Sequence, residues 1–113
     1  MDKGINKIIN SYVKYLLKEQ VIFEKAYLFG SYATSRQTKD SDIDIALIFS
    51  SNTIKDIFDL QVKLLTLASD IDTRIEPHPI SIDDFNSENP FSYEIIRTGK
   101  EIKINFPLAR RSL

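Results

Sequence analysis

The sequence predicts an α/β domain in which helices pack against a small mixed β-sheet. Two kinds of segment alternate along the 113 residues: runs with apolar residues at helical spacing, and short apolar runs bounded by turn residues. A chain of this length has room for one hydrophobic core, so we expect residues 1–113 to form a single domain. The apolar fraction of 42% and the charged fraction of 27% are typical of a globular domain.

Composition excludes several classes of protein. The net charge is −1, from 15 Lys and Arg against 16 Asp and Glu, so neither nucleic acid nor a membrane is an expected partner. The absence of cysteine excludes disulfides and thiolate metal sites. No apolar run has the length of a membrane span, and the N-terminus lacks the apolar region of a signal peptide. The cytoplasm is therefore the expected location.

The first half of the chain predicts a helix followed by two strands. Apolar residues at helical spacing indicate an amphipathic helix that packs one stripe on the core: Ile5, Ile8, Ile9, Tyr12, Val13, Leu16 and Leu17. Residues 26–29 and 43–49 are apolar, partly β-branched or aromatic, and are predicted to be buried strands. Between them, residues 32–36 are expected to form one or two helical turns with Ser31 near the N-cap.

The second half predicts helices and strands in alternation. A helix should follow the loop at residues 50–53, with Asn52 or Thr53 as its N-cap, and end near Ser69. Residues 70–78 are a strand candidate. Because proline cannot donate a ladder hydrogen bond, Pro77 and Pro79 predict that this strand lies at an edge of the sheet or ends near Glu76.

The last segments are shorter. Ser81 is predicted to cap a helical turn, and residues 91–97 a helix with four partly buried apolar or aromatic residues and Gly99 as C-cap. Residues 101–105 alternate and predict a last short strand, whereas residues 106–113 are expected to be loosely held.

The candidate chemistry lies between the two buried strands. Gly30 stands where the first strand ends, and a glycine there allows a ligand to approach the backbone closely. Asp42 and Asp44 are two residues apart on a strand, so both should face one side while Ile43 and Ile45 face the core. Neighbouring carboxylates repel unless a cation is bound, and Mg²⁺ is the usual cation for such oxygen ligands, often together with phosphates. The stretch therefore predicts a phosphate site beside a metal site.

Three further residues have open interpretations. Arg36 and Lys39 follow Gly30 on a polar segment, where either could reach a phosphate or be a solvated loop charge. His78 is the only histidine, and we interpret it as a surface strand residue. Strand alternation nevertheless puts it beside Glu76, so a role near an acceptor group stays open.

These motifs resemble a known family. Gly30-Ser31, ten intervening residues and Asp42-Ile43-Asp44, with a third carboxylate on a later strand, are similar to the nucleotidyltransferase superfamily of the DNA polymerase β type. The resemblance covers nearly the whole chain and implies the nucleotidyltransferase fold. The chain also resembles the minimal nucleotidyltransferases that pair with an all-helical HEPN-type protein as toxin–antitoxin systems. This implies transfer of AMP from ATP to a hydroxyl of the toxin, with tyrosine as the expected acceptor, and contact with the toxin in a hetero-oligomer.

The resemblance also implies roles for individual residues. Gly30 and Ser31 would hold the β- and γ-phosphates of ATP, with Arg36 and Lys39 as further nucleotide-binding candidates. Asp42 and Asp44 would bind two Mg²⁺ ions. Glu76 would be the third carboxylate, and all three residues would be metal ligands and catalytic residues. Glu76 would also help to deprotonate the acceptor. Asp72 is a rival third carboxylate, but it lies four residues, or about 13 Å, from Glu76 along an extended strand.

One departure and several alternatives remain. Ser35 stands where the family often has a glycine, which implies a different turn or a weaker grip on phosphate. The order of a Walker loop is absent. A non-catalytic subunit that masks its partner, or transfer to a small molecule such as an aminoglycoside, is the alternative function. The sequence does not separate protein, small-molecule and RNA acceptors, and it does not identify the nucleotide base.

Overall fold

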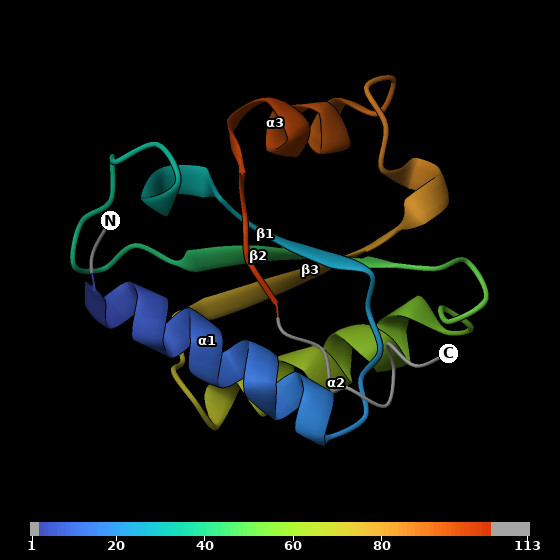
Figure 1. The fold of residues 1–113 in the computed structure, drawn as a ribbon, viewed down its shortest axis with the longest axis horizontal. Coiled ribbons are helices and arrows are strands. Elements are labelled where there is room, and N and C mark those ends of the chain that lie inside the picture. Colours follow the sequence, from blue (N-terminus) through green and yellow to red (C-terminus); the bar gives the residue numbers. More distant parts are fainter. Residues whose placement is uncertain (1–2, 105–113) are drawn as a thin grey trace.

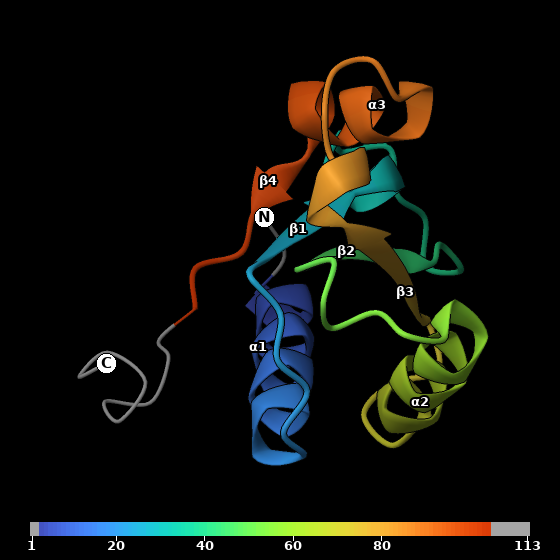
Figure 2. The same cartoon turned by 90° about the vertical axis from the view of Figure 1, so that its right-hand side faces the viewer.

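The computed structural model describes residues 3–104 and confirms the α/β class. Within these residues, three α-helices pack on the two faces of a four-stranded sheet. The helices α1 (Lys3–Lys18) and α2 (Ile57–Ser69) lie side by side under one face, and α3 (Pro90–Thr98) lies over the other (Figures 1 and 2). The sheet is therefore the middle of three layers.

The sheet is mixed, with the strand order β3-β2-β1-β4. The central strands are β2 (Ile43–Phe49) and β1 (Lys25–Phe29), which pair antiparallel, whereas β3 (Ile75–Ser81) runs parallel to β2. The edge strand β4 (Lys100–Glu101) pairs antiparallel with β1. The predicted bounds of β2 are confirmed, and β1 begins one residue before the predicted residue 26 and ends at Phe29 as predicted.

Alternation along β2 divides its side chains between two apolar cores. On the face under α1 and α2, four β2 residues are fully buried: Ile43, Ile45, Leu47 and Phe49. On the face under α3, Ala46 and Ile48 pack with Ile80 of β3 and Ile95 of α3. Successive side chains of a strand point to opposite faces, so Asp44 belongs to the α3 face. The predicted separation of the carboxylates from Ile43 and Ile45 is confirmed for Asp44.

The edge position of β3 accommodates its two prolines, as predicted. The Gln61 side chain of α2 donates to the Pro77 carbonyl over 2.9 Å, on the side of β3 away from β2. The nitrogen of Pro77 faces the same outer side, where it removes no ladder hydrogen bond. The strand does not end near Glu76 but continues through Pro79 to Ser81. It also begins later than the predicted residue 70.

Two of the predicted helix starts are wrong. The N-cap of α2 is Asp56, whose carboxylate accepts a hydrogen bond from the Asp59 N–H over 3.1 Å, while the Thr53 hydroxyl pairs with the Ser50 hydroxyl instead of capping the helix. The turn after β1 is a single 3-10 turn, η1 (Gly30–Tyr32), with Phe29 rather than Ser31 at its N-cap. The remaining residues as far as 36 do not continue it as a helix.

The C-terminal predictions are confirmed in part. Ser81 caps η2 (Ile82–Asp84), and Gly99 is the C-cap of α3. Of the α3 residues expected to be partly buried, Ile95 is fully buried, whereas Phe91, Tyr93 and Ile96 are close to half exposed. The predicted last strand is limited to β4, and Asn105 and residues 106–113 lie outside the described residues.

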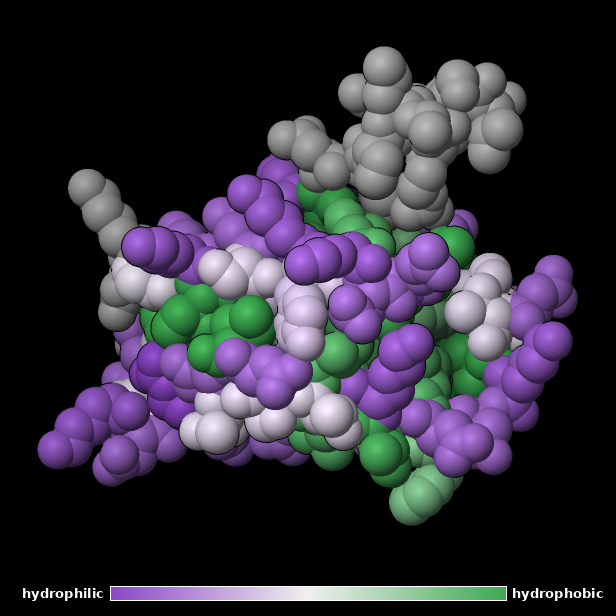
Figure 3. Space-filling view, turned by 90° about the horizontal axis from the view of Figure 1, so that it is seen from below, coloured by the Kyte–Doolittle hydropathy of each residue, from purple (hydrophilic) through white to green (hydrophobic). Residues whose placement is uncertain are grey.

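The face covered by α1 and α2 is mostly polar at its surface, with apolar side chains that interrupt it (Figure 3). Exposed apolar residues of α2 contribute to the molecular surface: Ile57, Phe58, Val62 and Leu65. None of the helices within residues 3–104 is long and apolar enough to cross a membrane.

Candidate active site

The turn after β1 brings its backbone against a carboxylate of β2. Gly30 has φ of +74°, a left-handed conformation that glycine adopts without strain. A Cβ atom at this position would overlap Oδ2 of Asp44. The 3-10 turn is closed by the Ala33 N–H, which donates to the Gly30 carbonyl over 3.1 Å. Two independent constraints, the backbone conformation and the contact with Asp44, therefore require glycine here.

Three carboxylates meet on the α3 face of the sheet, and we call Asp42, Asp44 and Glu76 the carboxylate cluster. Asp44 and Glu76 are direct neighbours in the parallel register of β2 and β3. A hydrogen bond between the Asp42 and Glu76 carboxyl groups raises the pKa of Glu76, and burial and the charge of Asp44 act in the same direction. His78 opposes this rise. The cluster is thus short of positive charge.

His78 lies two residues after Glu76 on β3, so its side chain is on the same face of the sheet and reaches the carboxylate cluster. Its Nε2 lies 3.3 Å from Asp44 Oδ1 and 3.9 Å from Glu76 Oε1. One potential ligand atom from each of the three residues falls within 4.8 Å of the others, a spacing that can hold a metal ion. The donor set of oxygens with one imidazole fits a divalent cation. The interpretation of His78 as a surface strand residue missed its contact with Asp44, because no potential metal ligand in the sequence identified itself as its partner. Strand alternation had nevertheless placed His78 beside Glu76.

The rival carboxylate lies elsewhere. Asp72 binds Arg74 through two contacts, Oδ2 to Nη2 over 3.0 Å and Oδ1 to Nε over 3.1 Å. This pairing with the Arg74 guanidinium lowers the pKa of Asp72. The guanidinium also donates to the hydroxyl of Tyr32 in η1 over 3.3 Å. The pair thus supports the turn after β1, and the structure brings Glu76, not Asp72, to Asp44.

The predicted nucleotide-binding cations lie on the loop between η1 and β2. Arg36 and Lys39 are both exposed, and Arg36 Nε donates to the Thr34 hydroxyl over 3.2 Å. Neither belongs to the carboxylate cluster. Ser35, where the resemblance implied a glycine, has φ of +60°, so this serine adopts a conformation that glycine favours. Ser31 lies within η1 and is half-buried.

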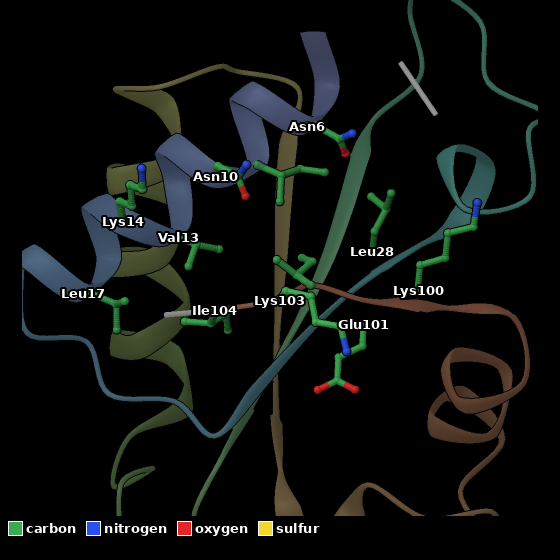
Figure 4. A pocket seen from close by; sticks show the side chains of 12 residues that line it. Asn6, Asn10, Val13, Lys14, Leu17, Leu28, Lys100, Glu101, Lys103 and Ile104 are labelled. Carbon is green, nitrogen blue, oxygen red and sulfur yellow. The ribbon is translucent and has the colours of Figure 1, made fainter. Parts of the chain in front are cut away.

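Two hollows lie among residues 3–104. One, of about 560 Å³, lies beside the carboxylate cluster, between the start of α2, the end of β3 and the start of α3, and His78 is among its lining residues. The other, of about 420 Å³, lies between α1 and residues 100–104 (Figure 4). Its lining includes Leu28, which packs in the core under α1 on the other face of the sheet. It contains no predicted site residue.

Comparison with protein families is decisive for the identity of this fold and its motifs. Residues 10–105 match the family model described as polymerase beta, nucleotidyltransferase. The chain belongs to this family. The matched range includes Gly30 and the whole carboxylate cluster. A comparison with curated proteins found no significant match.

Solved structures of nucleotidyltransferases and their complexes share the fold. A mutant form of the toxin–antitoxin complex MntA–HpeT contains a chain that is 26% identical, with a TM-score of 0.57 over 85% of this chain and 72% of that one. A toxin–antitoxin structure with AMP-PNP is 24% identical, with a TM-score of 0.58 over 88% and 73% of the two chains. A candidate nucleotidyltransferase of Sulfolobus solfataricus is 22% identical, with a TM-score of 0.56 over 70% and 68%.

Proposed function

We propose that this protein is a single-domain, Mg²⁺-dependent nucleotidyltransferase and the antitoxin of a two-component system. It transfers AMP from ATP to a hydroxyl group, that of a tyrosine, on a HEPN-type toxin and so neutralises the toxin. The observation that carries the proposal is the meeting of the Gly30 turn with Asp44 and Glu76 on adjacent strands of the nucleotidyltransferase fold.

Each part of this site has a task in the proposal. Gly30 and Ser31 bind the β- and γ-phosphates, because the turn lies directly against Asp44 of the carboxylate cluster. Asp42, Asp44 and Glu76 hold two Mg²⁺ ions. When bound, these cations neutralise phosphate charge and favour attack on the α-phosphorus. Arg36 and Lys39 add positive charge from the loop.

The reaction is an in-line displacement. The acceptor oxygen forms a bond to the α-phosphorus, and the bond from that phosphorus to the bridging oxygen of the β-phosphate breaks, so that pyrophosphate leaves. The acceptor proton passes to the Glu76 carboxylate. The products are an AMP ester of the acceptor and pyrophosphate.

The choice of a protein acceptor rests on the relatives. The solved structures similar to this chain include toxin–antitoxin complexes, one of which contains an ATP analogue. A toxin of this kind would share the cytoplasm with the antitoxin and form a hetero-oligomer with it.

The test is transfer of label from α-labelled ATP with Mg²⁺ to the product of the adjacent gene. The control is the variant with Asp42→Asn and Asp44→Asn. We expect a labelled partner with the natural protein and none with the variant. If the partner is bound and inhibited without any label, the protein acts by masking. If only a small molecule is labelled, the proposed acceptor is wrong.

A further inference from the structure

The cleft beside the carboxylate cluster lies at the β3 edge of the sheet. It lies between the start of α2 and the start of α3, which flank the end of β3 in Figure 2. Its volume of about 560 Å³ is within the range of roughly 300–1,000 Å³ that is usual for small-molecule sites. Ile57 and Phe91, which are 51% and 46% exposed, line it from the two helices. The cleft is therefore open and partly apolar.

His78 connects this cleft to the candidate chemistry. The residue lines the cleft, and its Nε2 is 3.3 Å from Asp44 Oδ1. Its ring packs against those of Phe29 and Phe91, with centroid distances of 5.0 and 5.7 Å. Phe29 and Phe91 also contact each other, at 5.5 Å. A group bound in the cleft can therefore contact the rings of His78 and Phe91, and His78 also contacts the carboxylate cluster.

The geometry of the proposed reaction favours an acceptor that approaches the carboxylate cluster from the β3 side. The attacking and leaving oxygens stand roughly in line across the α-phosphorus. In the proposed function, pyrophosphate leaves toward the Gly30 turn, which follows β1. The sheet order places β2 between β1 and β3, so the acceptor approaches from the β3 side. His78 and the cleft are on that side.

The lining chemistry suits an aromatic ring. Several polar side chains of the cleft already bind the protein itself: the Gln61 amide donates to the Pro77 carbonyl, Asn89 caps α3, and the Ser92 hydroxyl donates to the Asp84 carbonyl over 2.6 Å. Isoleucine side chains and the Phe91 ring contribute apolar surface. Aromatic groups bind such surfaces through burial and edge-to-face contacts.

We infer that this cleft is the acceptor subsite and that it takes the phenol ring of the tyrosine that receives AMP. The inference rests on the proposed function and adds to it the residues that select the acceptor. Phe91 and Ile57 are the specificity-determining side chains, and the His78 ring guides the hydroxyl toward the carboxylate cluster. The competing occupant is the adenine base of ATP.

A binding experiment on the full chain separates these occupants. Isoleucine methyl groups are followed by NMR while N-acetyl-L-tyrosinamide is added, with N-acetyl-L-serinamide as the hydroxyl compound that lacks a ring. We expect the tyrosine compound alone to shift the methyl signals of Ile54, Ile57 and Ile80, which line the cleft. The signals of Ile9, Ile102 and Ile104, which line the other hollow, are the internal control. Absence of the cleft shifts overturns the inference.

Repeating the titration with a non-hydrolysable ATP analogue and Mg²⁺ tests the competing occupant. An acceptor subsite still binds the tyrosine compound when the nucleotide is present. If the analogue displaces the compound and shifts the same three methyl signals, the cleft holds the base and the inference is wrong. This readout does not depend on transfer activity.

A kinetic experiment then compares two aromatic residues of α3. Phe91→Ala should raise the KM for the partner protein about tenfold, in line with the loss of a buried aromatic anchor, and leave the affinity for ATP unchanged. Tyr93→Ala is the matched control, because Tyr93 is 47% exposed on the same helix and is not among the cleft residues. Equal effects of the two variants overturn the inference. Absence of transfer with the natural protein instead contradicts the proposed function, and the methyl shifts still decide the nature of the cleft.

Discussion

Replacing Gly30 by alanine should strain the backbone, which lowers the free energy of unfolding, and displace the Asp44 carboxylate, which lowers the rate of transfer. Gly30 has φ of +74°, and a left-handed conformation costs an ordinary residue about 1–2 kcal/mol. The new methyl group would also overlap Oδ2 of Asp44, so the carboxylate or the turn must shift. We therefore expect Gly30→Ala to lower the free energy of unfolding by about 1–2 kcal/mol or somewhat more.

The effect on transfer should exceed the effect on stability. Displacement of a reacting group by about 1 Å can reduce a rate about a hundredfold. Urea denaturation measures the free energy of unfolding, and label transfer from ATP measures the rate of transfer under conditions where the variant is folded. A loss of stability with normal transfer would refute the view that contact between the turn and Asp44 organises the site.

Gly99→Ala is the matched control for this experiment. A Cβ atom at Gly99 would collide with the Ile95 carbonyl at the end of α3, so this variant should also be less stable. Gly99 has φ of −73° and no left-handed strain, and the collision does not involve Asp44. Transfer per folded molecule should therefore be nearly normal in this variant. A similar loss of transfer in both variants would mean that general destabilisation causes the effect.

Three further outcomes are expected. Ser35→Gly should raise the free energy of unfolding by up to about 1 kcal/mol, measured with urea, because φ of +60° strains serine; an unchanged or lower value would count against strain. Asp42→Asn should raise the urea midpoint while transfer is lost, because crowding with Glu76 is relieved; retained transfer would remove Asp42 from the site. Asp72→Asn should be less stable than the natural protein at pH 7 and equal to it in strong acid. The Arg74 contact lowers the pKa of Asp72, so its contribution is present above the unfolded pKa of about 3.9 and is lost as the pH falls through the lower folded value. A difference that persists at the lowest pH would contradict this pairing.

Local patterns in the sequence were sufficient for much of the fold. Strand β2 was predicted with its observed bounds because seven consecutive residues are apolar except for one carboxylate. The edge position of β3 followed from its two prolines, since a central strand cannot lose ladder donors. These features depend on properties that each segment carries by itself.

Contacts between distant segments explain what the sequence did not reveal. The start of α2 is an exception, because its cap is local: Asn52 and Thr53 are good capping residues, but α2 begins at Ile57, where Asp56 accepts from the Asp59 N–H. The overlap of a Cβ at Gly30 with Asp44 depends on the pairing of β1 with β2. The contact of His78 with Asp44 likewise requires the register between β2 and β3, and no local pattern specifies a register of this kind.

The directions of β1, β2 and β3 explain why the candidate site forms where the end of β1 meets the starts of β2 and β3. Because β1 and β2 are antiparallel, the end of β1 at Phe29 lies beside the start of β2, and Gly30 comes next to Asp44. Because β3 is parallel to β2, the start of β3 lies beside the start of β2, and Glu76 pairs with Asp44. Were β3 antiparallel over the same span, Glu76 would lie opposite Ile48, four residues or about 13 Å from Asp44. The mixed sheet is therefore a condition of the carboxylate cluster, since the same residues on an antiparallel β3 could not share a cation.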